Sequence, residues 1–227
     1  MDRSNQKVLV LGAVLVIIGI VLSGPPMVFL VEYLKPQPKW VDVDTFVSHF
    51  HKVQTLPYWF GFILLIGNIL FIASASRLPN IGNKIQSTLA IICLIIYSTL
   101  VTINYAIQTT TVPAMVTNPN ITLEIFSMTN PTSLCWTIEM FAYAILGVSY
   151  WLVAMAFRGM GLLRVIKYLM IINGVASVLG ILIPVIDPEL LLESGSYIGY
   201  VIWNIFIVLI MALIIIAFKN EKKQSSV

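Results

Sequence analysis

Six long apolar stretches decide what this chain can fold into. Each is long enough to cross the hydrocarbon core of a bilayer as a helix, which takes about 20 residues. Only 10% of the residues are charged, well below the roughly 25% of a soluble domain. We therefore predict an all-α integral membrane protein, a bundle of six transmembrane helices in a single membrane domain over residues 1–227. The predicted spans are 8–31, 56–75, 85–107, 134–157, 165–186 and 197–218.

The placement of lysine and arginine predicts how these spans are oriented. If the N-terminus is cytoplasmic, all but three of the 13 basic residues fall on the cytoplasmic side. This agrees with the rule that cytoplasmic loops carry an excess of lysine and arginine. The exceptions are Lys35, Lys39 and Lys52. We predict that both termini are cytoplasmic and that the membrane is a cell membrane, of the plasma or bacterial inner type. The predicted outer loops are 32–55, 108–133 and 187–196.

The first apolar stretch allows two interpretations. Arg3 and Lys7, followed by an apolar run up to Gly24, resemble a signal peptide, whose cleavage would leave one span fewer. The residues before Gly24 form no small-x-small cleavage site, however, and the apolar run resumes after Pro25 and Pro26. Because proline bends a helix that continues past it, we predict one kinked transmembrane helix.

The first outer loop is predicted to contain a short helix. Trp40, Val43, Val47 and Phe50 recur at helical spacing with polar residues between them, a pattern typical of a helix at a membrane interface. The same apolar residues could instead pack on the outer rim of the bundle. Both interpretations place the segment across the outer face.

The second outer loop carries two local signals. Asn120, Ile121 and Thr122 form an N-glycosylation acceptor triplet, a pattern that also arises by chance. Ser133 directly precedes the fourth span. A serine hydroxyl in that place can accept a backbone N–H of the first turn, so we predict that Ser133 caps the helix.

Glu139 is the one acid predicted to lie inside the bilayer. It falls about 9 Å below the outer end of the fourth span, at a helical rise of about 1.5 Å per residue. No lysine or arginine lies at comparable depth. A carboxyl group in a medium of low dielectric constant is either protonated or held by a cation or several hydrogen-bond donors. Glu139 is therefore the first candidate for a functional residue.

Polar and aromatic side chains gather at the predicted depth of Glu139. The third span runs outward, so Asn104 and Gln108 lie one turn apart near its outer end. The sixth span enters from outside and brings tyrosine, tryptophan and asparagine to the same level. The predicted ligand-binding set, which includes no catalytic and no metal-binding residue, is Glu139, Asn104, Gln108, Asn68, Tyr143, Trp136, Tyr200, Trp203 and Asn204.

Three interpretations of this cluster stay open. Interhelical hydrogen bonds hold membrane bundles together at roughly 0.6 to 2 kcal/mol each, so the cluster could be purely structural. It could line a ligand pocket open to the outside, or it could relay protons or cations. The aromatic residues add an ambiguity, because tryptophan and tyrosine form belts at both membrane interfaces without any ligand.

The fifth span carries a separate group of small residues. Gly174, Ala176 and Gly180 are predicted to let a neighbouring helix approach closely. Asn173 lies beside them, in the inner half of the span, and is predicted to be structural.

The chain offers little for other chemistry. His49 and His51 are its two histidines, and at this spacing they face different sides of a helix, so we expect no metal site. No histidine lies in a span to hold haem or to act as a hydrolase base. We predict no cofactor, and no nucleic-acid partner because the basic residues are scattered over loop ends.

Binding or transport is favoured over catalysis. The leading hypothesis is a bundle that binds, or helps to transport, a small molecule or lipid through an outward-facing polar pocket. The alternatives are a structural subunit that partners other membrane subunits, and a membrane-embedded enzyme acting on a lipid. The layout is similar to that of the substrate-binding subunits of vitamin importers, in helix number, small size and an aromatic pocket near the outer face. This resemblance extends to no motif and implies no residue roles.

Overall fold

The computed structural model describes residues 3–79, 84–119, 122–187, 190 and 194–224. All regular secondary structure in these ranges is helical. Six helical runs are long and apolar enough to cross a membrane, in agreement with the six predicted stretches. Asn120 and Ile121 of the predicted glycosylation triplet lie outside the described residues. The six runs are Arg3–Leu34, Lys52–Ala75, Lys84–Val116, Leu134–Ala154, Leu162–Gly180 and Gly195–Lys219.

The first run is broken where the sequence predicts a kink. Helix α1 (Arg3–Ser23) ends one residue before Gly24, and α2 (Pro25–Leu34) begins with two prolines. Proline suits the first turn of a helix, where its missing N–H would have no intrahelical partner. The two helices therefore form one bent unit.

The remaining long helices follow the prediction with small shifts at their ends. Ser133 caps α8 as expected, since its hydroxyl accepts the backbone N–H of Trp136 at 3.1 Å. The fifth predicted span is interrupted after Gly180, where α9 ends and the short helix α10 follows. The elements are α4 (Leu56–Ala75), α5 (Lys84–Ala106), α8 (Leu134–Ala154), α9 (Leu162–Gly180), α10 (Leu182–Ile186) and α11 (Ser194–Gln224).

The third helical run extends further than predicted. Residues from Gln108 onward were predicted to form a loop, but η2 (Ile107–Thr111) and α6 (Val112–Val116) continue the helix. Element η2 is a turn of π-helix. Pro113 follows it closely and has no N–H for the usual α-helical bond, which accounts for the wider turn. The helix thus absorbs the proline by changing its hydrogen-bond register.

The loops at one end of the bundle form a small cap. It consists of α3 (Val43–His49), η1 (Lys52–Thr55), α6 and α7 (Thr122–Phe126). The predicted short helix is thus present. Its central buried residue is Phe46, which the predicted apolar stripe did not include. The buried residues of this cap are Phe46, Val112 and Leu123.

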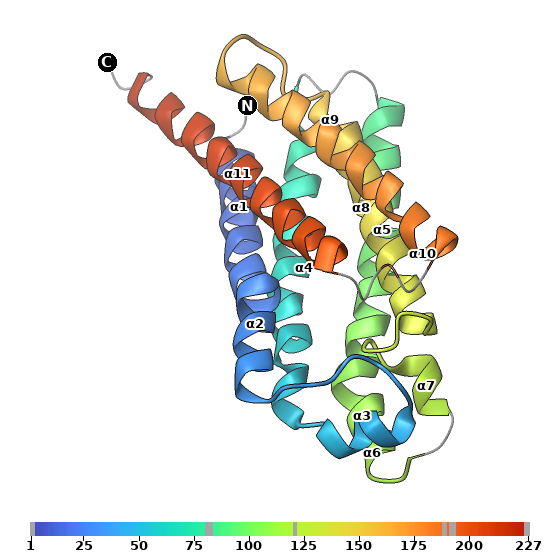
Figure 1. Cartoon of the computed structure of the whole chain (residues 1–227). Helices are drawn as coiled ribbons and strands as arrows, with labels where there is room; N and C mark the ends of the chain where they lie inside the picture. Colours follow the sequence, from blue (N-terminus) through green and yellow to red (C-terminus); the bar gives the residue numbers. More distant parts are fainter. Residues whose placement is uncertain (1–2, 80–83, 120–121, 188–189, 191–193, 225–227) are drawn as a thin grey trace.

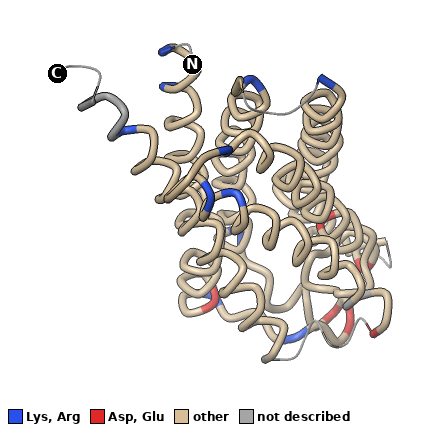
Figure 2. The backbone as a smooth tube through the Cα atoms, turned by 90° about the horizontal axis from the view of Figure 1, so that it is seen from above, with Lys and Arg blue, Asp and Glu red and all other residues tan. Residues whose placement is uncertain are grey.

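Both termini lie at one end of the bundle and the cap lies at the other, as Figure 1 shows. We call the first the terminal end and the second the cap end. Most lysines and arginines (blue) lie on one side of the view in Figure 2, and most acids (red) lie on the other. Helix α1 packs along α4, whereas α8 packs between α5 and α9. Helix α11 leans on α1 and α9.

Candidate functional site

The carboxyl group of Glu139 is held by two neighbouring residues of α5. The side-chain amide of Asn104 donates to Oε2 at 2.6 Å. The hydroxyl of Tyr105 donates to Oε1 at 3.4 Å. Helices α5 and α8 pack closely side by side, which places the outer end of α5 at the depth of Glu139. The predicted match in depth between Glu139 and Asn104 is therefore a direct contact.

Gln108 lies one turn beyond Asn104 and fixes the orientation of the Asn104 side-chain amide. Its own amide donates to the backbone oxygen of Phe126 at 2.7 Å, and its oxygen accepts the backbone N–H of Met128 at 3.3 Å. The Gln108 amide also lies 3.5 Å from Oδ1 of Asn104. Because Oδ1 faces this donor, the amide nitrogen of Asn104 faces Glu139. The cap thus positions a donor toward the carboxyl group.

Two tyrosine hydroxyls extend the network. Those of Tyr105 and Tyr143 lie 3.0 Å apart, and either can donate. Each hydroxyl has a single proton. If Tyr143 donates to Tyr105 and Tyr105 donates to Glu139, every bond in the chain points toward the carboxyl group. This arrangement suits a carboxylate, which only accepts hydrogen bonds.

All the groups bonded to Glu139 are electrically neutral. Asn104 and Tyr105 supply donors but no charge. Within the described residues, no lysine or arginine forms an ion pair with this carboxyl group. An ionised Glu139 would therefore keep a negative charge that the described protein does not balance.

Aromatic rings from four helices gather around the carboxyl group. The Tyr58 ring of α4 lies 5.7 Å from that of Tyr105. On the other side, the Tyr143 and Trp203 rings meet edge to face at 5.5 Å. Tyr200, also on α11, lies about one turn before Trp203 along the helix. Together with Glu139, the residues Tyr58, Tyr105, Tyr143, Tyr200 and Trp203 form what we call the aromatic cluster.

The aromatic cluster has a buried side and an open side. Asn104 and Tyr105 are 0% and 5% exposed. Glu139 and Tyr143 are only half-buried, and Tyr200 is 37% exposed. Over the described ranges, α11 does not pack its backbone closely against α4 or α8. The Trp203 ring of α11 nevertheless reaches the Tyr143 ring of α8, so aromatic side chains join these two helices at the depth of Glu139.

Three predicted residues lie elsewhere. Asn68 pairs with Tyr150, whose hydroxyl donates to Oδ1 at 2.7 Å. Asn204 donates to the backbone oxygen of Tyr200 in its own helix at 2.8 Å. Trp136 contributes its backbone N–H to the cap of α8. None of these three bonds involves Glu139.

Two members of the aromatic cluster were missing from the predicted set. Tyr105 follows Asn104 directly, and the prediction traced only the stripe of Asn104 and Gln108 along the helix. Tyr58 lies near the outer end of the second predicted span. A count of all tyrosines at the depth of Glu139 would have found both residues, because helical rise alone fixes depth.

Comparisons with protein-family models, curated proteins and solved structures gave no match. In the part of the chain that the structure describes, no group of three histidine, cysteine or acidic side chains could hold a metal ion. The arrangement around Glu139 is therefore the basis on which a function is proposed.

Proposed function

We propose that this protein binds, and helps to move through a cell membrane, a small molecule or lipid that carries an organic ammonium group. The cap end faces the outside, and Glu139 is the polar anchor. The observation that carries the proposal is the half-buried carboxyl group, which is held by neutral donors and lies among aromatic side chains.

Electrostatics favours a cationic ligand. A carboxylate in a membrane-embedded site is costly unless a positive charge balances it. The donors Asn104 and Tyr105 hold the carboxyl group in place without neutralising it. An ammonium group on the open side would supply the missing charge.

The surrounding rings favour the same ligand class. The faces of tryptophan and tyrosine attract cations through their quadrupoles, and cages of such rings recognise quaternary ammonium groups. The rings of Tyr143 and Trp203 lie against each other beside Glu139. Trp203 is fixed by donating to the Ser177 hydroxyl at 3.0 Å. A ring held in this way keeps its orientation when no ligand is present.

The orientation rests on charge. Most lysines and arginines fall in the two termini and in the loops at the terminal end of the bundle. The cytoplasmic side of a membrane protein is enriched in these residues. With the terminal end inside, the open side of the aromatic cluster is reached from the outer leaflet or the outer solution.

A structural subunit is the second candidate. It is favoured by the extensive hydrogen bonding of Gln108, which ties the cap to α5. A protonated Glu139 could donate to Tyr105 and serve only to join α5 to α8. The polar cluster would then contribute to packing with other membrane subunits and not to ligand recognition.

A matched pair of ligands separates these functions. Choline and 3,3-dimethylbutanol have nearly the same shape, but only choline is charged. We expect choline to raise the unfolding temperature of the purified protein in nanodiscs, because a ligand that binds only the folded state stabilises it. The uncharged alcohol should have little effect. An equal response to both ligands, or to neither, would contradict the proposal.

A second titration distinguishes a lipid from a free organic cation as the natural ligand. Lysophosphatidylcholine carries the same trimethylammonium group, linked through a phosphate and a glycerol to an acyl chain. If the natural ligand is a lipid, this probe should bind at least about tenfold more tightly than choline, since each buried methylene adds roughly 0.8 kcal/mol. Equal affinities would indicate a free organic cation.

A further inference from the structure

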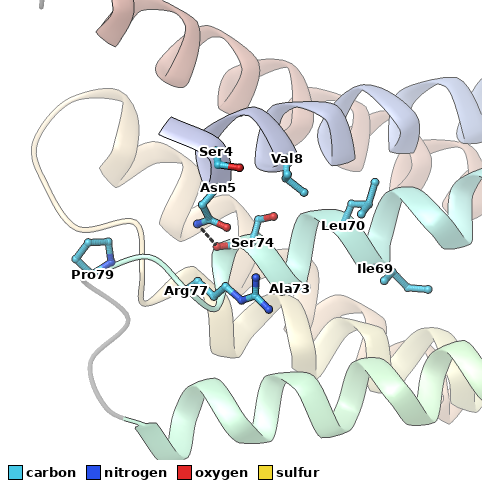
Figure 3. A pocket seen from close by; sticks show the side chains of 9 residues that line it. All are labelled: Ser4, Asn5, Val8, Ile69, Leu70, Ala73, Ser74, Arg77 and Pro79. Carbon is cyan, nitrogen blue, oxygen red and sulfur yellow. Dashed lines mark hydrogen bonds between the residues drawn. The ribbon is translucent and has the colours of Figure 1, made fainter. Parts of the chain in front are cut away.

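A groove at the terminal end carries chemistry unlike that of the aromatic cluster. It lies between the start of α1 and the end of α4, with a volume of about 400 Å³. Figure 3 shows polar side chains at one end of the groove, where Ser4, Asn5 and Arg77 lie. Val8 and Leu70 line its other end. The groove is thus amphipathic along its length.

Arg77 supplies an unpaired positive charge to this groove. It follows the end of α4 and is exposed. Among the described residues, its guanidinium group forms no hydrogen bond or ion pair. Figure 3 shows its side chain lying over Ala73, alongside the groove. A guanidinium group has five N–H donors in a planar fork that matches a phosphate group.

A hydrogen bond between two lining residues fixes the wall of the groove. The side-chain amide of Asn5 donates to the backbone oxygen of Ser74 at 3.0 Å and joins α1 to α4. No acidic residue lines the groove in the described part of the chain. Its charge is therefore positive, and an anion entering it meets no repulsion from its walls.

We propose that this groove binds the phosphate headgroup of one anionic membrane phospholipid. The phosphate pairs with Arg77, and the start of an acyl chain lies along Val8 and Leu70. The joint presence of a charged end and an apolar end favours a lipid over a free inorganic anion. Basic pockets between transmembrane helices at the cytoplasmic side bind such headgroups. This site is independent of the aromatic cluster at the opposite end.

Lipid retention in native mass spectrometry tests the proposal. We expect the wild-type protein to retain phosphatidylglycerol in preference to phosphatidylcholine. Arg77→Gln should lower phosphatidylglycerol retention about tenfold, the loss expected for one charge-assisted pair. Arg164→Gln is the matched control, since it removes the same charge from an exposed site outside the groove. An equal loss in both variants would overturn the proposal, because it would indicate unspecific attraction.

A groove-filling variant and a competition with inorganic phosphate test the proposal further. Ala73→Leu leaves every charge in place but fills the groove, so it too should lower phosphatidylglycerol retention. Unchanged retention in that variant would overturn the groove as the site. Inorganic phosphate at 10 mM should not displace the lipid, and displacement would show that the site takes a free anion. Unfolding temperatures close to that of the wild type confirm that each variant is folded.

Discussion

The contact between α1 and α4 and the region around Glu139 join helices in different ways. Along α1 and α4, a Cβ atom added at Gly12 would lie 2.4 Å from the Phe71 backbone nitrogen, and one added at Gly67 would lie 2.6 Å from that of Val16. The helices touch there through backbone, as small residues allow in membranes. Around Glu139, by contrast, hydrogen bonds and half-buried rings join the helices.

This difference shows that tight packing and the polar cluster are separate features. The packing of α1 against α4 is extensive and uses no ionisable side chain along its middle. A membrane bundle built in this way does not need a carboxyl group to hold together. Glu139 is half-buried and lies beside the fully buried Asn104, and an ionisable side chain inside a membrane bundle is a candidate for function.

The largest effect on stability should come from Gly12→Ala. Its added methyl group would force the backbone of α4 away at Phe71, and overpacking of this kind costs about 1–3 kcal/mol. We expect the unfolding temperature to fall by roughly 3–10 °C, on the scale of a chain of this size. Gly180→Ala is the control, because among the described residues no atom outside its own stretch of helix lies within 4 Å of its added Cβ. Equal unfolding temperatures for the two variants would contradict the close contact.

Tyr150→Phe should have the next largest effect on stability. It removes the hydroxyl that donates to Asn68 at 2.7 Å and leaves a buried acceptor unpaired, at a cost of about 1–2 kcal/mol. The unfolding temperature should fall by roughly 2–6 °C, while choline affinity stays unchanged. Tyr168→Phe, at an exposed position, serves as the control. A loss of choline binding in Tyr150→Phe would mean that the deeper pair belongs to the ligand site.

Trp203→Phe should weaken binding more than it weakens the fold. The variant keeps a ring beside Tyr143 but loses the stronger cation attraction of tryptophan, worth about 0.5–1 kcal/mol. Choline affinity should fall by roughly two- to fivefold. Trp151→Phe, which is exposed on α8, should bind choline as the wild type does. Identical affinities in the two variants would remove Trp203 from the site.

The smallest effect concerns the cap. The Thr45 backbone N–H donates to Asp42 at 2.7 Å and holds the pKa of that carboxyl below its usual value. Because the pKa is lower in the folded state, the contribution of Asp42 is present at neutral pH and is lost as the pH falls through the folded pKa.

Hydrogen exchange measures this effect in α3. Relative to Asp42→Asn, amide protection over residues 43–49 should be higher in the wild type at pH 7. The difference should shrink as the solution is acidified past the ordinary range for aspartate. A difference that does not change with pH would show that the charge of Asp42 plays no part.

Local signals made several features predictable from sequence. The break at Gly24 and the cap at Ser133 depend on residues next to them. The shared depth of Asn104 and Glu139 follows from helical rise alone. In contrast, the continuation of the helix beyond Gln108 was missed, because the effect of Pro113 is to change the hydrogen-bond register and not to end the helix.

Features that depend on how helices rotate against one another were not predictable. Gly174 and Gly180 were both expected to admit a neighbour. A Cβ atom at Gly174 would meet the Gly147 backbone at 2.6 Å, whereas nothing lies within 4 Å of one at Gly180. Asn204 has the predicted depth but bonds within its own helix. Sequence gives the depth of a side chain in a span, but its direction depends on partners far away in the chain.

The most direct test is to titrate choline into the wild type and Glu139→Gln under the same conditions, with Glu124→Gln, an exposed acid of the cap, as control. The substitution at Glu139 keeps the shape of the side chain and one acceptor oxygen for Asn104, replaces the other oxygen by an NH2 group that the Tyr105 hydroxyl can accept, and removes the charge. We predict at least about a tenfold loss of affinity in Glu139→Gln, none in Glu124→Gln, and an unfolding temperature near that of the wild type. Equal choline affinity in all three proteins would contradict a role for Glu139 as the anchor of a cationic ligand.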